Sequence, residues 1–407
     1  PTSAKKEKRG LKSKSTKATS TIVQVQDSNE EHESSVFERP NVQVPANKVY
    51  LETVYDSNEN LVKLKFLKNK IIPRMVIKVM ALAMPYQKYL TSITINSGLR
   101  MDSLYEMSKC LPNSQITEIC LDGVFLSKAN YHILLEHGKL KHLSLARCTL
   151  NDTVVKNIAD QLTDPSPAAK ILSALNLSCN RITDVGAQYL ADMLRTNRQL
   201  SYLNLAGNMI TDEGGVCILK TLQKFKMQSQ ELIESRYKYV AHLKEKKALI
   251  NKFIEELQIK CKLAVSQSIH YSNLDFTAQI IEDKAEFMAN KELGLYNEPF
   301  SPDNTEVRDG FVYCLGNNTL CCLNLAYNNL SYVSLKELLE VLKMQKYLNR
   351  IPRGLVKVVI EGNLMPIACK EYEQIDRLLN SVTSNIRNKS ESILKKKQFP
   401  AKRRESK

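Results

Sequence analysis

Apolar residues recur along this chain with two periods that follow each other in a fixed order. Between residues 172 and 199, leucines spaced by three and then two positions precede apolar residues spaced by three and four, at Ala187, Leu190 and Leu194. The two-residue spacing is typical of a short β-strand with one apolar face. The wider spacing is typical of an amphipathic helix. Each such unit is therefore predicted to be a strand, a turn and a helix.

The unit is repeated along the chain. The pattern of 172–199 returns 28 residues later, and the template LxxLxLxxNx(L/I/M) or a degenerate copy of it begins at eight positions: Leu61, Leu90, Ile116, Leu140, Leu172, Leu200, Leu320 and Leu355. A single unit cannot bury both of its faces, whereas stacked units share a continuous core. The predicted fold class is therefore α/β, a horseshoe-like solenoid with strands on the concave side and helices on the convex side.

An asparagine occupies the position where the chain leaves the strand in five units. A carboxamide can bond both donors and acceptors of the backbone. We therefore expect these residues to support the turn and to bond the neighbouring unit: Asn69, Asn180, Asn208, Asn328 and Asn363.

The repeats are interrupted once, which predicts five segments. They are a basic and polar tail with an extended segment (1–48), about six repeats (49–222), an insertion (223–317), the last two repeats with a C-terminal helix (318–382) and a basic tail (383–407). Near-heptad apolar positions predict a long amphipathic helix at about 223–260, followed by a loop. That helix either folds back against the convex side or protrudes as an arm that docks onto a partner.

The residue between the two strand leucines is predicted to point outward on the concave side. Along the stack these residues are Lys65, Thr94, Cys120, Ser144, Asn176, Asn204, Asn324 and Val359. The row is small, polar and weakly charged, unlike a nucleic-acid groove lined with arginine and aromatic residues. It suits a protein partner or a segment of polypeptide, and the alternative is that the row is merely solvated.

These motifs resemble the leucine-rich repeat superfamily, and the 28-residue spacing with "ITDxG" resembles its ribonuclease-inhibitor-like subclass. The layout of regular units, an exit helix "ELIESRYKYV", a long insertion and two last units is similar to repeat proteins associated with motile cilia and sperm flagella. That resemblance implies a non-enzymatic protein of the cytoplasm and cytoskeleton, located in the axoneme. The insertion is richer in apolar residues than the resemblance implies, which leaves any function of the insertion open.

The net charge of +15 is concentrated at the two ends of the chain. Residues 1–20 carry +6 and residues 383–407 carry +7, which leaves +2 for everything between them. Segments of this composition cannot pack a core, so they are either solvated tails or a means of binding acidic surfaces such as tubulin, RNA or anionic lipid. The residues predicted to make such contacts are Lys5, Lys6, Lys8, Arg9, Lys395, Lys396, Lys397, Lys402, Arg403 and Arg404.

No motif for catalysis, a cofactor or a metal is found. The sequence contains no phosphate-binding glycine loop, no HExxH and no GxSxG, its ten cysteines lack metal-ligand spacing, and no run of 18 apolar residues predicts a membrane span. Asp184, Asp212 and Glu213 are explained as charges at helix N-termini. Enzymatic activity is therefore not expected, and the cysteines are expected to be reduced intracellular thiols.

Two functions remain open from the sequence. The first is a scaffold of the ciliary or flagellar axoneme, a monomer within a hetero-assembly, with axonemal complex subunits and tubulin as partners and no nucleic acid. The second is a cytosolic recognition adaptor outside cilia, such as the substrate reader of a ubiquitin ligase or an inhibitor.

Overall fold

The computed structural model describes residues 18–24, 48–126, 130–266, 278–294, 296, 298–366 and 368–382; for 18–24, 261–266 and 278 it gives the backbone only. The chain divides into two compact units. The repeat unit comprises Pro1–Leu222 and Asn317–Lys407, and the insertion unit comprises Gln223–Gly316. The basic residues predicted to bind acidic surfaces, in 1–17 and 383–407, lie outside the described residues.

One ten-stranded sheet runs through the repeat unit, in the order β1-β2-β3-β4-β5-β6-β7-β8-β12-β13. The strands from β3 onward are parallel, as strand–turn–helix units require. They are β3 (Leu61–Phe66), β4 (Ser92–Ile95), β5 (Glu118–Cys120), β6 (His142–Ser144), β7 (Ala174–Asn176), β8 (Tyr202–Asn204), β12 (Cys322–Asn324) and β13 (Lys357–Val359). Because β12 pairs directly with β8, the sheet is continuous across the insertion.

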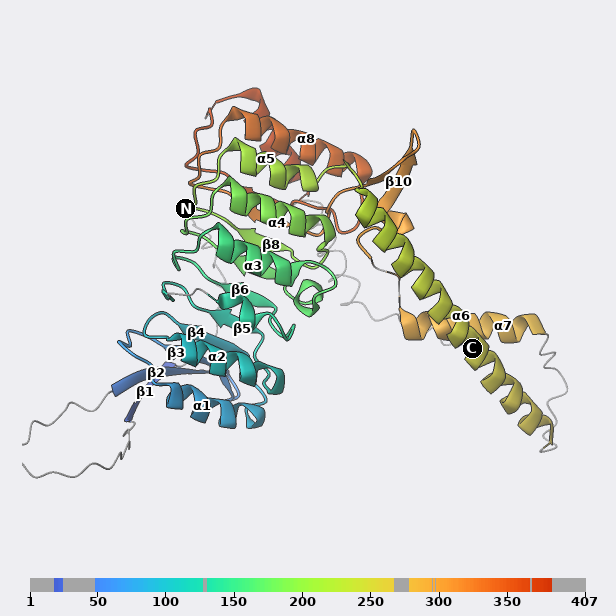
Figure 1. Ribbon diagram of the computed structural model, residues 1–407, viewed down its shortest axis with the longest axis horizontal. Helices are drawn as coiled ribbons and strands as arrows, with labels where there is room; N and C mark the ends of the chain where they lie inside the picture. The colour runs from blue at the N-terminus through green and yellow to red at the C-terminus, as the bar shows by residue number, and fades with distance from the viewer. Residues whose placement is uncertain are drawn as a thin grey trace, which may run out of the picture. The chain divides into compact units, whose positions relative to one another are not determined.

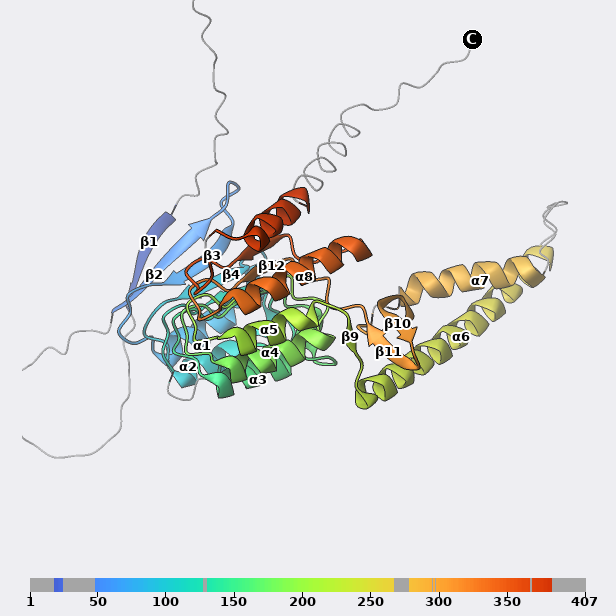
Figure 2. The same cartoon turned by 90° about the horizontal axis from the view of Figure 1, so that it is seen from above.

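Helices form a second layer that covers one face of this sheet (Figure 1). They are α1 (Arg74–Ala83), α2 (Met101–Cys110), α3 (Asp152–Leu162), α4 (Asp184–Thr196), α5 (Asp212–Thr221) and α8 (Tyr332–Leu348), and residues 370–382 are also helical. Figure 2 shows the strands and the helices as two layers. The strand leucines Leu175, Leu203 and Leu323 are almost completely buried between them. The predicted α/β leucine-rich repeat solenoid is thereby confirmed.

One unit differs from the strand–turn–helix prediction. In the described residues between Ile116 and Leu140, the helix is replaced by a short 3-10 turn, η3 (Tyr131–Leu134). This unit has 24 residues, four fewer than the 28-residue units, which leaves too little chain for a full helix. Tyr131 fills the core of this shorter unit. Its side chain is completely buried, and its hydroxyl donates to the carbonyl of Val124 at 2.7 Å.

The N-terminal edge of the sheet is extended by two antiparallel strands, β1 (Ala18–Gln24) and β2 (Lys48–Tyr55). The sequence analysis predicted a tail with an extended segment over 1–48, and β1 lies within that range. The sequence of β1, ATSTIVQ, is rich in β-branched residues, which favour strands. An uncovered strand edge offers unpaired backbone groups, so these residues pair there despite the charged sequence before them.

The asparagine that follows the strand in five of the units bonds backbone groups outside its own unit. Asn180 donates to the carbonyls of Leu145 and Leu177 at 3.0 and 2.9 Å, and its Oδ1 accepts from the backbone of Cys148 and Leu150. One carboxamide thus bonds its own unit and the preceding one. Similar inter-unit bonds are made by Asn208, Asn328 and Asn363. Asn69 instead exchanges bonds with the backbone of Tyr50 in β2.

The aspartate in the first turn of a helix bonds the following repeat, which the sequence analysis did not anticipate. Asp184 accepts from the backbone and hydroxyl of Thr211, both at 2.7 Å, and from the backbone of Gly214 at 3.0 Å. A Cβ on Gly214 would lie 2.6 Å from Asp184 Oδ1, which explains the glycine of "ITDxG". Asp152 makes the same contacts with Thr183 and Gly186. These carboxylates therefore act between units as well as at their own helix.

The insertion unit contains more structure than the predicted helix and loop. Its long helix is α6 (Ser229–Ser266), followed by α7 (Ala278–Leu293) and a three-stranded sheet of β9 (Phe225–Lys226), β10 (Thr305–Arg308) and β11 (Phe311–Cys314). The two helices pack through Phe253, Leu257, Ala285 and Ala289. The sequence analysis did not predict α7. Its residues that face α6 include alanines, which indicate the apolar face of a helix less clearly than leucines do. Although α6 has 38 residues, neither it nor any other helix in the described residues has an apolar stretch sufficient to cross a membrane.

Candidate protein-interaction surface

The eight residues predicted to point outward from the repeat strands lie in one row. Each is paired in register with the next, from Lys65 opposite Thr94 to Asn324 opposite Val359. All eight are half-buried, as expected for side chains that stand side by side on a sheet face not covered by helices. We call this face the open face and these eight residues the central row. The structure brings the predicted residues together; whether they bind a protein stays a prediction.

A second row runs beside the central row, two positions earlier on each strand. Its members are also paired in register: Lys63, Ser92, Glu118, His142, Ala174, Tyr202, Cys322 and Lys357. Tyr202 is 39% exposed and is the largest side chain of this row. The sequence analysis did not assign this row, although the two-residue period of a strand places it on the same face.

Three asparagines form the middle of the central row. The Oδ1 atoms of Asn176, Asn204 and Asn324 accept from the backbone two residues later, at 3.2, 3.1 and 3.0 Å. This bond fixes the orientation of each carboxamide. The Nδ2 of Asn176 donates to Ser144 Oγ at 2.9 Å, whereas those of Asn204 and Asn324 have no acceptor in the described part of the chain. Two neighbouring amide groups are therefore available to donate to a ligand.

Charged groups lie toward the N-terminal half of the open face. Glu118 Oε1 lies 3.0 Å from His142 Nδ1, and Lys65 pairs with Glu52 at 2.6 Å. Asp122 accepts from Ser144 Oγ at 2.6 Å. These groups are partners of one another, so the free amide donors of the central row are those of Asn204 on β8 and Asn324 on β12.

The described residues contain no group of three His, Cys, Asp or Glu side chains placed to hold a metal. Burial raises the pKa of Cys120 in the central row, and it raises the pKa of Cys110 and Cys148 to about 11. These groups are therefore protonated thiols at neutral pH, which are poor nucleophiles.

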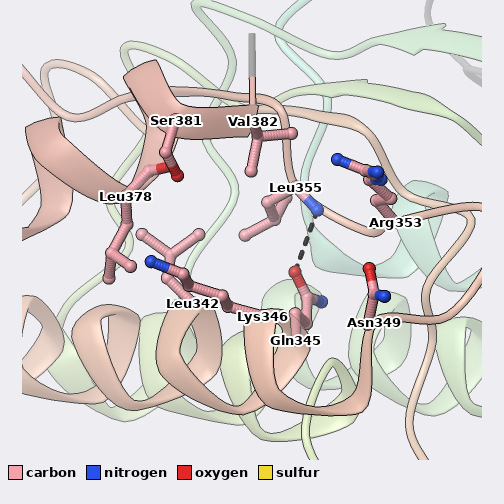
Figure 3. Close-up of a pocket in the computed structure, with 9 residues that line it drawn as sticks. All are labelled: Leu342, Gln345, Lys346, Asn349, Arg353, Leu355, Leu378, Ser381 and Val382. Atoms are coloured by element: carbon pink, nitrogen blue, oxygen red, sulfur yellow. Dashed lines mark hydrogen bonds between the residues drawn. The ribbon is translucent and has the colours of Figure 1, made fainter. Parts of the chain in front are cut away.

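A pocket of about 250 Å³ lies at the C-terminal end of the repeats (Figure 3). Gln345 crosses its floor, where its Oε1 accepts from the backbone of Leu355 at 2.9 Å and its Nε2 donates to the carbonyl of Leu222 at 3.4 Å. Lys346 and Arg353 line the rim. Because Gln345 is occupied by these backbone bonds, the pocket is best explained as part of the joint between the last two repeats.

A known family matches two of the repeats. The family model described as "Leucine Rich repeat" matches residues 171–191 and 196–219. One similar solved structure is leiomodin-1 actin-binding site 2, with 13% identity, a TM-score of 0.33 and coverage of 64% of this chain and 92% of that one. Another is an internalin (inlF) from Listeria monocytogenes str. 4b F2365, with 12% identity, a TM-score of 0.30 and coverage of 76% of this chain and 64% of that one. No curated protein matched the chain.

Proposed function

From the premise that the chain carries leucine-rich repeats, we propose that it is a non-enzymatic scaffold whose open face binds another protein. The observation that carries this proposal is the unbroken central row, eight residues in register across β3–β8, β12 and β13. Stacked repeats present an extended binding surface of this kind. Binding a protein on this surface requires no catalytic loop or pocket.

The chemistry of the middle of the row favours a polypeptide segment rich in acceptors. Asn204 and Asn324 offer amide donors, and Tyr202 beside them offers an exposed ring. Backbone carbonyls or carboxamide oxygens of a partner would satisfy these donors, and tyrosine is among the residues enriched at interface hot spots. The segment would lie across β7, β8 and β12.

We further propose that the scaffold works in the axoneme of motile cilia or flagella, with axonemal complex subunits and tubulin as partners. This rests on the similarity of the chain's layout to leucine-rich repeat-containing protein 71, a protein of that setting. A tagged chain expressed in ciliated cells is expected to stay with axonemes after detergent extraction. Release by mild detergent alone would contradict this placement.

The open face can be tested with charged substitutions in the middle of the row. The double variant Asn204→Arg with Asn324→Arg is expected to weaken retention on purified axonemes by at least about tenfold, because two bulky cations replace the amide donors at the centre of the interface. Both side chains are only half-buried, so the fold should survive. Gln188→Arg on α4, an exposed amide on the helix side, is the matched control. Equal retention of both variants would show that the open face is not the binding surface.

The basic tails can be tested separately. Because β1 begins at Ala18, deletion of 1–17 and 383–407 removes both tails and leaves every described strand in place. The deletion is expected to lower affinity for stabilised microtubules by about tenfold or more at low salt, and by much less at high salt, because the attraction is screened. Co-sedimentation over a salt series measures this. Unchanged binding at low salt would dismiss the tails as tubulin contacts.

A further inference from the structure

The outer face of α1 is apolar and exposed. Met75, Val79, Leu82 and Tyr86, which follows in the 3-10 turn η1 (Met84–Tyr86), are 52%, 60%, 75% and 82% exposed. They follow a spacing of four, three and four residues, which places them on one side of the helix. Ile77, on the opposite side, is completely buried in the repeat core. We call these four exposed side chains the α1 stripe.

The adjacent helix α2 does not share this property. Its exposed positions are Asp102, Tyr105 and Lys109, two of them charged, and the exposed positions of α3 are all polar. A helix with apolar residues all round is normally buried, and a contiguous exposed apolar patch on a soluble protein marks an interaction site. The α1 stripe is therefore expected to be a binding site.

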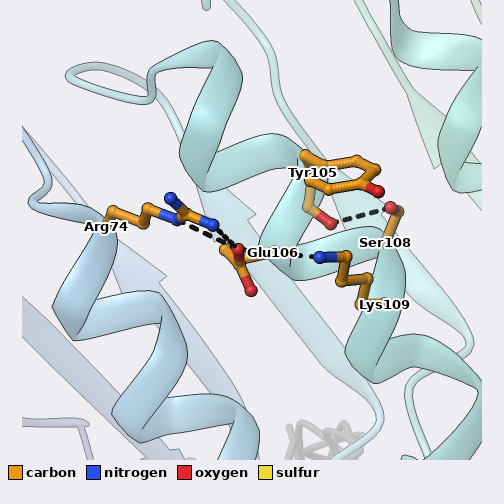
Figure 4. Close-up of polar contacts among 5 residues, drawn as sticks. All are labelled: Arg74, Tyr105, Glu106, Ser108 and Lys109. Atoms are coloured by element: carbon orange, nitrogen blue, oxygen red, sulfur yellow. Dashed lines mark hydrogen bonds and ion pairs between the residues drawn. The ribbon is translucent and has the colours of Figure 1, made fainter.

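The segment of the chain that carries the stripe is strongly basic. Residues 61–100 contain eight Lys or Arg and no Asp or Glu. Arg74 already has a partner, because it forms an ion pair with Glu106 of α2 (Figure 4). The hydrogen bond between them lowers the pKa of the Glu106 carboxyl. Lys70, Lys78 and Lys88 are exposed and form no ion pair in the described part of the chain.

We propose that the α1 stripe is the docking site for an acidic amphipathic helix of another protein. The partner helix would carry apolar residues at the same four-three-four spacing and Asp or Glu at the flanking positions, facing Lys70, Lys78 and Lys88. The stripe extends over residues 75–86, about 18 Å at 1.5 Å per residue, which matches about three turns of a partner helix. The apolar residues supply affinity, and the charges select the partner.

Two other occupants fit the observations less well. A second copy of the chain would bring Lys70, Lys78 and Lys88 of one copy close to the same three lysines of the other, and like charges repel. An anionic bilayer would need a broad apolar surface. The stripe is one helix wide, and the exposed positions of the adjacent α2 are Asp102, Tyr105 and Lys109, two of which are charged.

This site is separate from the open face. The α1 stripe belongs to the helix layer and the central row belongs to the opposite face of the sheet (Figures 1 and 2). The scaffold would therefore have two independent protein contacts. The inference stands on the apolar exposure and charge of α1, so it survives failure of the proposed role of the open face.

The test uses two designed helical peptides of about 16 residues, each with leucines at the four-three-four spacing. One carries glutamates at all other surface positions and the other carries lysines. Fluorescence anisotropy with the full chain is expected to show at least about tenfold tighter binding of the glutamate peptide. Val79→Glu with Leu82→Glu should abolish this binding, while Val185→Glu, at a similarly exposed valine of α4, should leave it unchanged.

A charge reversal makes the test sharper. Lys70→Glu, Lys78→Glu and Lys88→Glu together should invert the preference, so that the lysine peptide binds more tightly, with circular dichroism unchanged because all three lysines are exposed. Equal binding of the two peptides, or no binding of either, would overturn the proposal.

Three further results would assign the stripe to another occupant and overturn the proposal. Sedimentation with phosphatidylserine vesicles without peptide binding would assign it to a membrane. A dimer that dissociates in Val79→Glu with Leu82→Glu would assign it to a second copy. Glutamate-peptide binding that appears only when Asp27, Glu30, Glu31 and Glu33 are neutralised would assign it to residues 25–47 of this chain, whose net charge is −4.

Discussion

Replacing Asn328 by alanine is expected to lower the free energy of unfolding of the repeat unit by about 2–4 kcal/mol. Asn328 is 5% exposed. Its Nδ2 donates to the carbonyls of Leu205 and Leu325 at 3.0 and 3.1 Å, and its Oδ1 accepts from the backbone of Ile210 at 3.2 Å. Alanine would leave these buried backbone groups without their partner, which water cannot replace. Urea unfolding followed by circular dichroism measures the loss.

The adjacent residue provides the control. Asn329 is exposed, and only its backbone takes part in the contacts of this turn. Asn329→Ala is therefore expected to change stability by no more than about 0.5 kcal/mol. Asn328 also joins the repeats on the two sides of the insertion, since Leu205 and Ile210 precede it by more than 100 residues. If Asn328→Ala behaves like Asn329→Ala, the asparagine bonds do not hold the repeats together.

The repeat sheet is the part of the fold that the sequence predicts best. The LxL spacing fixes which side chains enter the core, and stacking of like units fixes the register. Together they place the central row correctly from Lys65 to Val359. This works because each repeat strand packs beside strands of the same pattern. The pattern of one unit therefore also predicts its contacts with units that are distant in the sequence.

Other features depend on contacts that one unit does not encode. The pairing of α7 with α6 relies on Ala285 and Ala289. Small side chains of this kind occur in loops as well as in helices, so they did not predict a buried helix face. The bonds from Asp184 to Thr211 and Gly214 cross between units, so the aspartate alone suggested only a cap of its own helix. The net charge between the tails did not reveal the basic segment that contains α1, because acidic residues elsewhere in that part of the chain offset its charge.

The two proposed contact surfaces differ in what they can recognise. The open face presents fixed amide donors at Asn204 and Asn324, which suit an extended backbone. The α1 stripe presents apolar side chains between cations, which suits a helix. A scaffold with both can hold two partners of different structure at once, and substitutions on one surface should leave binding at the other unchanged.

Asp212→Ala is expected to destabilise the joint across the insertion by about 2 kcal/mol at neutral pH. Asp212 accepts from the backbone of Ser331 and Ser334 at 2.9 and 3.1 Å and from both of their hydroxyls, at the N-terminus of α8. Alanine would remove all four bonds and the negative charge that favours this helix end. Thermal unfolding monitored by circular dichroism measures the change. Glu213→Ala, at the exposed next position, should have little effect because the side chain of Glu213 makes no hydrogen bond to the residues that the structure describes.

The pH dependence distinguishes this joint from simple packing. Burial alone would raise the pKa of Asp212, but the hydrogen bonds from Ser331 and Ser334 outweigh it and hold the pKa below its ordinary value of 3.8. A carboxyl whose pKa is lower in the folded than in the unfolded chain stabilises the fold above the unfolded pKa, and this contribution is lost as pH falls through the folded pKa. The difference in stability between the unmodified chain and Asp212→Ala should therefore be constant from neutral pH down to about pH 5 and shrink below about pH 4. A difference that stays constant to pH 2 would mean that the aspartate acts through its volume and not through its charge.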